Sequence, residues 1–373
     1  MGYRRPDGSV GTRNPLIILP SVFCANSTVE KIAAQIPGAI PMPHAVGCAQ
    51  VGLDLELTAR TLKAMGCHPN AGAVIVVGLG CERFDPQELY DAVKATGKPV
   101  AKFVIQEEGG ITNTVKRAVE VGKQFAAELA RQQRVPCPLS ALMVGTKCGG
   151  TDATSGLAAN PAVGNMVDRV VAEGGSAILS ELNELLGTEK FLAKRAVNEE
   201  VAQKIYDAIY EIEDVLRGGL DFSLPENRNH LISRGNFAGG VSSIVEKALG
   251  GVHKSGTAPI QDVLQYAIPP REDQHGLFLM DYESQDGEVV TGMIGCGSQL
   301  VAFTTGRGHA TGHPLVPVVK ITGNYKTYAS MTECFDFDAS DIISKGASIE
   351  DVGKKLLELV IRVASGEVTA AER

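Results

Sequence analysis

Short apolar runs alternate along the chain with longer amphipathic segments, which is typical of a parallel sheet covered by helices on both faces. In the first third, four runs are predicted to be strands: residues 15–20, 39–42, 73–77 and 100–105. Four segments between and after them are predicted to be helices: residues 27–35, 53–65, 86–96 and 112–131. This order predicts an α/β layered domain.

The same alternation continues in the remainder of the chain. Further strands are predicted at residues 141–144, 177–180, 276–280, 300–304 and 316–321, and helices at 192–216 and 349–364. Residues 218–240 show little periodicity and contain Pro225, Asn227, Asn229 and Asn236, which predicts a long irregular connection. The polar segment 131–138 is the predicted linker between domains 1–136 and 137–373. We therefore predict an α/β protein with layered, mostly parallel sheets in two Rossmann-like domains.

Composition and charge narrow the classes of partner. The chain has 373 residues, a hydrophobic fraction of 44% and a net charge of −8, which argues against nucleic-acid binding and against an anionic membrane surface. It lacks the apolar run of a signal peptide or membrane span, so a cytoplasmic location is expected. In such a reducing compartment, the eight cysteines are expected to be buried thiols or metal ligands. The expected partner is a small molecule, which the Arg307 motif described below narrows to an acidic, hydroxylated one.

Several cysteines follow predicted strands directly, and the chain is rich in glycine, with 42 residues. Cys81 and Cys148 each end a strand-Gly-x-x-Cys pattern, and Cys24 follows the first strand in a looser version. Open α/β sheets bind their ligands at the carboxyl ends of the strands. These turns are therefore the predicted location of the site.

Two motifs in the first domain carry possible metal ligands. His44 and Cys48 lie four residues apart in a predicted loop, and imidazole with thiolate suits zinc or iron; the alternative is a surface histidine beside an inert thiol. The turn Gly78-Leu79-Gly80-Cys81-Glu82 exposes backbone N–H groups to an anion. Glu82 is either a ligand or base, or an acid at the start of the next helix.

Two motifs in the second domain favour substrate binding. Residues 147–156 (KCGGTDATSG) combine a cation, a thiol, two glycines and hydroxyls, although Asp152 or Thr154 could instead cap the next helix. In residues 304–314 (TTGRGHATGHP), Arg307 between two glycines suits carboxylate recognition, the alternative being a basic surface turn. Lys247 and Lys254 are expected to be solvated. Dinucleotide, P-loop and serine-hydrolase motifs are absent from the sequence.

Together and in order, these motifs resemble the large catalytic region of the altronate and galactarate (sugar-acid) dehydratase family, to which the large subunit of sulfolactate sulfo-lyase is related. The resemblance covers essentially the whole chain. It is carried by residues 2–14 (GYRRPDGSVGTRN), 44–48 (HAVGC), 78–82 (GLGCE), 148–152 (CGGTD), 159–164 (ANPAVG) and 305–308 (TGRG). It implies loss of water from a 2,3-dihydroxy carboxylate to give a 2-keto-3-deoxy acid, with Fe²⁺ or Mn²⁺ as Lewis acid.

The resemblance leaves three functions open. The chain is expected to be a metal-dependent sugar-acid dehydratase, the large subunit of (2R)-sulfolactate sulfo-lyase, which releases sulfite, or a non-catalytic sugar-acid-binding subunit. Full-length dehydratases of this family carry a small N-terminal domain before this region. A separate small subunit that supplies this domain is therefore expected, as is a homo-oligomer. The turn 308–312 differs from that of the dehydratases, which leaves the substrate open.

The resemblance and the motifs together give the candidate site residues. The expected metal ligands are His44, Cys24, Cys48, Cys81 and Cys148, around a single ion or, alternatively, an iron–sulfur cluster. The candidates for general acid and base are His44, Glu82, Lys147, Asp152 and His309. The expected substrate contacts are Gly149, Gly150, Thr151, Thr305, Gly306 and Arg307. These turns are predicted to converge on one site for an anionic substrate.

Overall fold

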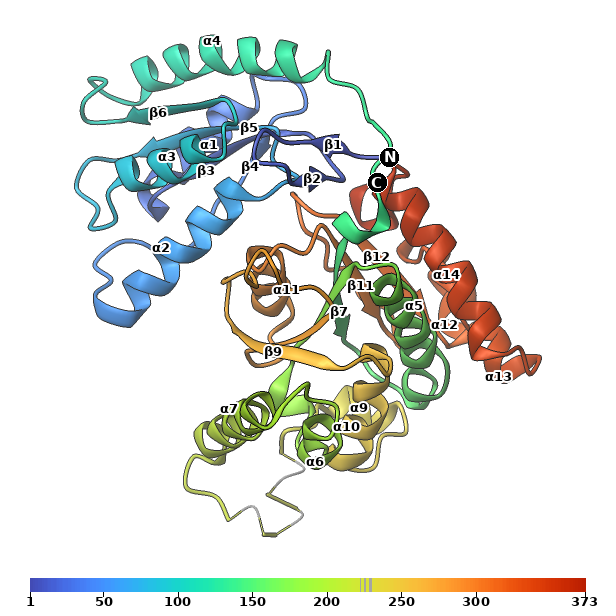
Figure 1. Ribbon diagram of the computed structural model, residues 1–373. Helices are drawn as coiled ribbons and strands as arrows, with labels where there is room; N and C mark the ends of the chain where they lie inside the picture. Colours follow the sequence, from blue (N-terminus) through green and yellow to red (C-terminus); the bar gives the residue numbers. More distant parts are fainter. Residues whose placement is uncertain (222, 225, 228–229) are drawn as a thin grey trace. The chain divides into compact units, whose positions relative to one another are not determined.

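The computed structural model describes residues 1–221, 223–224, 226–227 and 230–373, and it divides into two compact units. Unit 1 comprises Met1–Cys137 with Pro314–Val316 and Ala364–Gly366; unit 2 comprises Pro138–His313, Pro317–Val363 and Glu367–Arg373. Each unit is built on a parallel sheet with helices packed against it (Figure 1). The prediction of a layered α/β fold with mostly parallel sheets is confirmed.

Unit 1 contains a four-stranded parallel sheet in the order β4-β3-β5-β6. Its strands are β3 (Leu16–Pro20), β4 (Ile40–Pro41), β5 (Ala73–Gly78) and β6 (Val100–Val104), preceded by the hairpin β1 (Tyr3–Arg4) and β2 (Val10–Gly11). Every residue of β3 and β5 is buried, because these two central strands are covered on both faces. Pro20 pairs with Val77, so these two strands end at the same level.

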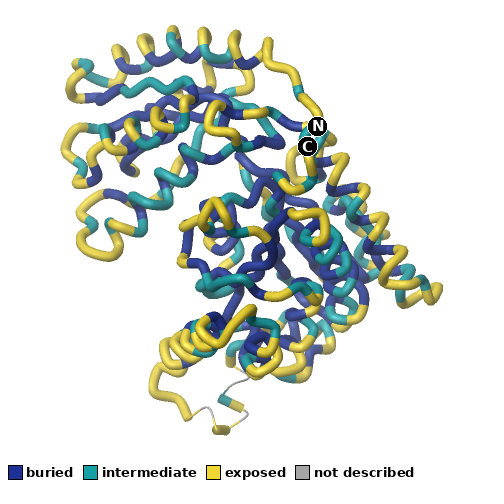
Figure 2. Tube along the Cα trace, in the orientation of Figure 1, coloured by how far each residue is buried: buried dark blue, intermediate teal, exposed yellow. Residues whose placement is uncertain are grey.

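Two pairs of helices cover the sheet of unit 1. They are α1 (Asn26–Ala33) with α4 (Ile111–Leu129), and α2 (Gly52–Cys67) with α3 (Pro86–Ala95). Alternate residues of a strand face opposite sides. Accordingly, Ile18 belongs to the core formed with α1 and α4, whereas Leu19 lies close to Gly66 of α2. Figure 2 shows the buried strands inside and the exposed outer turns of the helices.

Unit 2 contains a seven-stranded parallel sheet in the order β13-β12-β11-β7-β8-β10-β9. Its strands are β7 (Met143–Cys148), β8 (Ser176–Leu179), β9 (Ile260–Gln265), β10 (Leu277–Asp281), β11 (Leu300–Thr304), β12 (Val318–Thr322) and β13 (Phe337–Asp338). From β7 the chain first builds one side of the sheet, through β8, and later the other side, through β11. Ligands of such sheets bind at this reversal, beyond the carboxyl ends of the strands.

The helices of unit 2 connect and cover these strands. They are α5 (Asn160–Ala172), α6 (Glu189–Ala193), α7 (Glu199–Arg217), α9 (Arg234–Ala238), α10 (Ile244–Val252), α11 (Asp286–Gly295), α12 (Tyr325–Ser330), α13 (Asp341–Ser344) and α14 (Ile349–Ala364). A π-helical turn, Ser155–Ala159, leads into α5. None of the described helices is both long and apolar enough to cross a membrane.

Two predictions for unit 2 are modified by the structure or lie partly outside it, and one strand was not predicted. The helical region predicted over 192–216 is divided, because Asn198 starts a new helix by accepting a hydrogen bond from the Val201 N–H. Strand β9 carries several half-buried positions, and the apolar pattern did not reveal it. In the predicted irregular connection 218–240, Pro225 and Asn229 lie outside the described residues, and α9 occupies part of the remainder.

Candidate active site

A buried network of charged side chains lies at the carboxyl ends of β7 and β8. Lys147, on β7, and Lys254, in the turn after α10, both form ion pairs with Glu181, which follows β8. The three side chains are at most 1% exposed. Glu181 has a left-handed backbone with a φ of 73°, a conformation that costs a non-glycine residue free energy and persists where the surroundings fix it.

Burial and charge act in opposite directions on the two lysines. Burial alone would lower the pKa of Lys147 and of Lys254, because the interior disfavours a charged ammonium. Neighbouring groups outweigh burial and raise both pKa values: Glu181 first for Lys147, and Cys148 followed by Glu181 for Lys254. Both ammonium groups are therefore charged at neutral pH.

Cys148 and Glu184 extend this network. Nζ of Lys254 donates to Sγ of Cys148 at 3.1 Å, and Oε2 of Glu184 lies 3.5 Å from the same sulfur. Oε1 of Glu184 pairs with Lys247 at 2.8 Å. Burial raises the pKa of the Cys148 thiol to about 11, with a further contribution from the charge of Glu181. The thiol is therefore protonated near neutral pH.

The group Cys148, Glu181 and Glu184 could bind a metal ion, because its ligand atoms all lie within 4.8 Å of one another. Each of these donors is, however, already in contact with an ammonium group. In addition, the thiolate and not the thiol is the ligand form of cysteine. A metal ion at this position would have to displace at least one lysine, so the donor set fits an ion-pair network better than an open metal site.

Lys147 also connects the network to groups that a ligand can reach. Its Nζ lies 2.7 Å from Oδ1 of Asp286, and Oδ2 of Asp286 lies 2.7 Å from Nε2 of His309. The side chains of Asp286 and His309 are 32% and 26% exposed. Burial alone would raise the pKa of Asp286, but His309 and Lys147 outweigh it and lower this pKa to about 2. A continuous chain of charged and polar groups thus runs from Glu181 to the accessible ring of His309.

The turns that follow β7 and β11 lie against each other. The N–H groups of Gly306 and Arg307 donate to the carbonyl oxygen of Gly150 at 3.2 and 3.1 Å. Gly150 has a φ of 59°, which suits glycine. A Cβ on Gly306 would lie 2.0 Å from Cγ of Asp152, so only glycine leaves room for this carboxylate.

Asp152 acts here as a cap. Its Oδ1 accepts hydrogen bonds from the N–H of Ser155 at 3.0 Å and from Oγ1 of Thr154 at 2.7 Å, and its Oδ2 accepts from Nδ2 of Asn324 at 2.7 Å. These bonds fix the start of the helical segment that leads into α5. The geometry favours the capping alternative over a role for Asp152 in proton transfer.

Gly306→Ala is expected to lower the free energy of unfolding by about 1–3 kcal/mol, as overpacking does elsewhere. The added methyl group would collide with Asp152, which cannot move without losing its hydrogen bonds to Thr154, Ser155 and Asn324. Urea denaturation measures the change. Gly287→Ala is the matched control, because a Cβ there meets no atom within 4 Å. Equal stability of the two variants would contradict a fixed position for Asp152.

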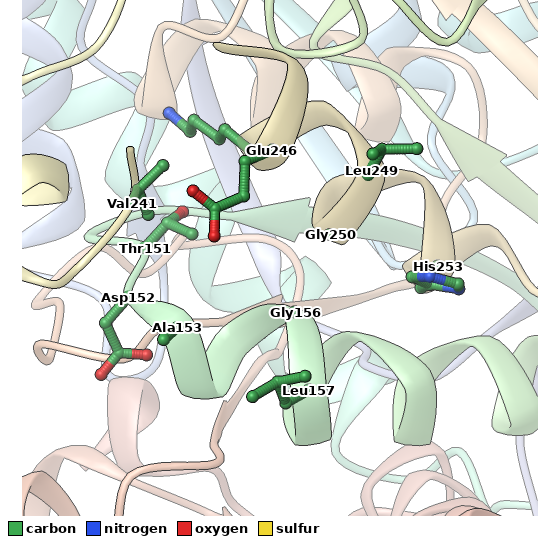
Figure 3. Close-up of a pocket in the computed structure, with 11 residues that line it drawn as sticks. Thr151, Asp152, Ala153, Gly156, Leu157, Val241, Glu246, Leu249, Gly250 and His253 are labelled. Carbon is green, nitrogen blue, oxygen red and sulfur yellow. The ribbon is translucent and has the colours of Figure 1, made fainter. Parts of the chain in front are cut away.

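Two pockets flank Asp152. The first has a volume of about 360 Å³ and is lined by Asp152, Ala238, Gly239, Gly306, Arg307, Asn324 and Thr327. The second, of about 270 Å³, lies between the start of the α5 segment and α10, and Leu157 and Leu249 contribute to its wall (Figure 3). The first pocket, which we call the Arg307 pocket, is polar and fits a small hydroxylated acid. The second pocket fits such an acid less well, because leucine side chains are exposed in it.

In unit 1, three loops at the carboxyl end of the sheet carry Cys24, Cys48 and Cys81. All three cysteines are exposed, and partial desolvation together with the neighbouring thiol of Cys48 raises the pKa of the Cys24 thiol. Three hydrogen bonds join the loops: Phe23 N–H to Val46 O at 2.9 Å, Asn26 Nδ2 to His44 O at 2.7 Å, and Ser21 Oγ to Glu82 Oε1 at 2.7 Å. The loops therefore form one connected structure.

His44 and Glu82 are engaged within these loops. Nε2 of His44 lies 2.9 Å from the carbonyl oxygen of Pro20, and its Nδ1 accepts from the N–H of Val46 at 3.3 Å. Burial lowers the pKa of His44. Burial would raise the pKa of Glu82, but hydrogen bonds, first that of Ser21, outweigh it and lower this pKa. Both residues thus have structural roles that compete with ligand binding and proton transfer.

The predicted site residues fall into two groups. Unit 2 contains Lys147, Cys148, Gly149, Gly150, Thr151, Asp152, Thr305, Gly306, Arg307 and His309, and unit 1 contains Cys24, His44, Cys48, Cys81 and Glu82. The convergence of both groups on one site stays a prediction.

Sequence reasoning missed the acidic half of the unit 2 network: Glu181, Glu184 and Asp286. The expectation that Lys247 and Lys254 are solvated is wrong, since they are 8% and 0% exposed. Glu181 could have been found, because it directly follows the predicted strand 177–180, in the way that Cys148 ends its own strand. The burial of the two lysines had no comparable signal.

The fold and these sites define a two-unit parallel α/β protein with a charged site at the reversal of strand order. Residues 139–373 match the family described as "D-galactarate/Altronate dehydratase, C-terminal", and residues 2–130 match "D-galactarate dehydratase/Altronate hydrolase, second domain". The chain belongs to the galactarate/altronate dehydratase family, and it is an enzyme of the lyase class.

Three relatives illustrate the range of the family. The chain is 37% identical to "(2R)-sulfolactate sulfo-lyase subunit beta" of Chromohalobacter salexigens, over 100% of this chain and 94% of that protein. It is 35% identical to "Altronate dehydratase" of Bacillus subtilis, over 100% and 75%. It is 34% identical to "Galactarate dehydratase (L-threo-forming)" of Escherichia coli, over 98% and 72%.

Proposed function

We propose that the chain is the catalytic large chain of a metal-dependent hydro-lyase, which removes water from a sugar acid such as altronate or galactarate and forms a 2-keto-3-deoxy acid. The observation that carries this proposal is the polar Arg307 pocket, whose wall includes residues of the turns after β7 and β11. These turns adjoin the series of ion-paired side chains that runs from Glu181 to His309. The names of the relatives support the substrate class.

In this proposal the substrate carboxylate binds to Arg307. The guanidinium is exposed in the pocket and can donate two parallel hydrogen bonds to a carboxylate. Asn324 and Thr327 line the same pocket and offer polar atoms to the substrate hydroxyls. A volume of about 360 Å³ suits a short polyhydroxy acid.

The acid–base work is assigned to His309. Lys147 has a raised pKa and stays charged, so it stabilises negative charge and does not take a proton. Asp152 and Glu82 are engaged in hydrogen bonds within their turns. His309 is accessible and oriented by Asp286 at Nε2, and its Nδ1 accepts one hydrogen bond, from the Thr311 N–H at 3.2 Å. We assign removal of the C2 proton to this Nδ1, which requires the Thr311 bond to open when substrate binds. The C3 hydroxyl then accepts a proton from the His309 imidazolium and leaves as water, which returns the ring to its neutral form, and the enol tautomerises to the 2-keto acid.

The metal is proposed to be Fe²⁺, or alternatively Mn²⁺, as the family resemblance implies. When bound, it would supply Lewis-acid stabilisation of the enediolate formed at C2. Exposed thiols without a lysine pairing, such as those of Cys24, Cys48 and Cys81, suit a soft transition metal better than the lysine-paired Cys148 group.

A second candidate is (2R)-sulfolactate sulfo-lyase activity. The observation that favours it is the 37% identity to subunit beta of that enzyme over 94% of its length. Because that relative is named a subunit, we also propose that a separate small subunit assists this chain.

One experiment separates these functions. The purified chain, with and without the small subunit, is incubated anaerobically with Fe²⁺ and altronate, galactarate or sulfolactate, and 2-keto acid and sulfite are assayed. A keto acid formed from a sugar acid supports the hydro-lyase, and sulfite formed from sulfolactate supports the sulfo-lyase. No turnover of any substrate under both conditions contradicts both and favours a non-catalytic binding subunit.

Arg307→Ala is expected to weaken binding of the acidic substrate by about 1.5–3 kcal/mol, the range for hydrogen bonds to a charged group. The measurement is KM for the substrate, with direct titration of a competitive carboxylate inhibitor. Arg271→Ala, at an exposed position outside the pocket, is the matched control. An unchanged affinity in Arg307→Ala would exclude Arg307 as the carboxylate anchor.

A further inference from the structure

We infer that Lys320 is a second anion-binding residue of the candidate active site, and that the substrate therefore carries an acidic group besides the carboxylate assigned to Arg307. The inference rests on the proposed function for the reaction that this substrate undergoes. Binding of an unreactive diacid is measurable without turnover, so the two can fail separately.

Lys320 lies in one row with residues of the candidate site. Phe303 of β11 pairs with Lys147 of β7 on one side and with Lys320 of β12 on the other, and paired residues of adjacent strands point to the same face of the sheet (Figure 1). Nζ of each lysine lies 5.7 Å from the centroid of the Phe303 ring. The ring of His309 lies 5.0 Å from the same ring, centroid to centroid. Two ammonium groups thus share one aromatic ring with the proposed base.

The two lysines of this row differ in their partners. Nζ of Lys147 pairs with Glu181 and Asp286. Lys320 is 2% exposed, but among the described residues its Nζ has no hydrogen-bond acceptor and no ion-pair partner. A cation–π contact offsets only part of the cost of removing an ammonium group from water, and buried charges are normally paired. An anionic ligand would supply the missing partner.

The acidic side chains that act on the Lys320 ammonium group, Asp336 and Cys334, lie beyond ion-pair distance. Burial lowers the pKa of Lys320, and the charges of these two groups oppose this effect. Both carboxylate oxygens of Asp336 accept backbone hydrogen bonds: Oδ2 from the N–H of Lys320 at 2.8 Å and Oδ1 from the N–H of Ala370 at 2.7 Å. Asp336 is thus held by the backbone, away from Nζ of Lys320.

Lys320 shares neighbours with the turn that contains Arg307. A Cβ on Gly308 of this turn would lie 2.7 Å from Sδ of Met331. The carbonyl oxygen of Met331 accepts a hydrogen bond from the N–H of Cys334 at 2.8 Å, and Cys334 acts electrostatically on Lys320. The segment after α12 therefore connects the two cations. In our inference, an extended acid held at Arg307 reaches Lys320 with its second acidic group.

Two cations select substrates with two anionic groups. Galactarate has a carboxylate at each end, and sulfolactate has a carboxylate and a sulfonate, whereas altronate has one carboxylate. The inference thus favours a galactarate-like diacid or a sulfo-carboxylate over altronate.

Calorimetric titration of the full chain with pairs of unreactive acids tests the inference. Adipate and hexanoate match in length, carry two and one carboxylates, and lack a hydroxyl that could leave; 3-sulfopropanoate and propanoate are the corresponding pair for a sulfonate. We expect the dianion of at least one pair to bind about 10–100-fold more tightly than its monoanion, the effect of hydrogen bonding to a charged group. A preference for adipate indicates a diacid substrate, and one for 3-sulfopropanoate indicates a sulfo-carboxylate.

Two variants assign this preference to the two cations. Lys320→Met should lose it while keeping its affinity for the monoanion, and Arg307→Ala should weaken binding of the dianion as well. Without ligand, Lys320→Met should have a Tm equal to or above that of the wild type, because it removes a buried charge without a partner. Lys345→Met, at an exposed position of the same unit, is the matched control and should keep the preference.

Three outcomes would overturn the inference: equal affinities of the wild type within both pairs of acids, an unchanged preference in Lys320→Met, or a lowered Tm of that variant, which would assign Lys320 a structural role. A preference that depends on Lys320, without turnover of any sugar acid or of sulfolactate, would contradict the proposed function and leave this inference standing.

Discussion

Replacing Glu181 with glutamine is expected to lower the free energy of unfolding by about 3–5 kcal/mol, the range for breaking a buried ion pair by removing one partner. The carboxylate is the shared partner of Lys147 and Lys254, and all three side chains are buried. Glutamine keeps the size of the side chain but leaves the two ammonium groups with too little negative charge. Urea denaturation measures the loss.

The pH dependence of this variant distinguishes a charge effect from a packing effect. In the wild type the pKa of each lysine is raised, so their contribution is fully present below the unfolded pKa, near 10.4, and is lost as the pH rises through the higher folded pKa. In Glu181→Gln, burial is expected to lower the folded pKa of at least one lysine below its unfolded value. The variant should then regain stability between about pH 8 and 10, whereas the wild type does not.

Two comparison variants complete the test. Glu200→Gln removes an exposed partner of Lys204 and should change stability by less than about 1 kcal/mol. The double variant Glu181→Gln/Lys254→Met removes one of the two stranded charges and should recover part of the loss. A Glu181→Gln protein as stable as the wild type at every pH would show that the buried network does not hold the site together.

The layered fold and the position of the site at the strand ends could be predicted because both depend on local sequence. The apolar run of β5 is continuous, and the neighbouring strand β3 ends at the same level. The two turns that contain Gly150 and Gly306 follow adjacent strands, so their contact results directly from the strand order. The sequence predicted that both turns follow parallel strands, but it did not predict the strand order that makes them neighbours.

The chemistry of the network depends on contacts that local sequence does not encode. Glu181 and Lys254 are 73 residues apart, and they meet because the turn after α10 lies against the end of β8. A lysine near a glycine turn is normally solvated, and nothing in its neighbours along the chain signals full burial. The roles of His44 and Glu82 likewise depend on backbone groups positioned by the folded loops.

His309→Gln is expected to lower kcat by about 10²–10⁴-fold, the usual contribution of a positioned general base. KM should change little, because the carboxylate anchor is assigned to Arg307. Asp286→Asn tests whether Asp286 positions the ring of His309. The amide keeps the shape of the side chain that contacts Nε2 of His309, but it binds this nitrogen more weakly than the carboxylate does. We expect a smaller loss of kcat in this variant, with the affinity for substrate retained.

Exchange of the C2 hydrogen with solvent deuterium provides a readout that a purely structural role would not change. The wild type should exchange this hydrogen before or during loss of water, and His309→Gln should do neither at a measurable rate. His275→Gln, at an exposed position in the same unit, is the matched control and should behave like the wild type. If His309→Gln retains both kcat and exchange, the base must be another group; Lys147 is an unsuitable substitute, because its raised pKa keeps it protonated at neutral pH.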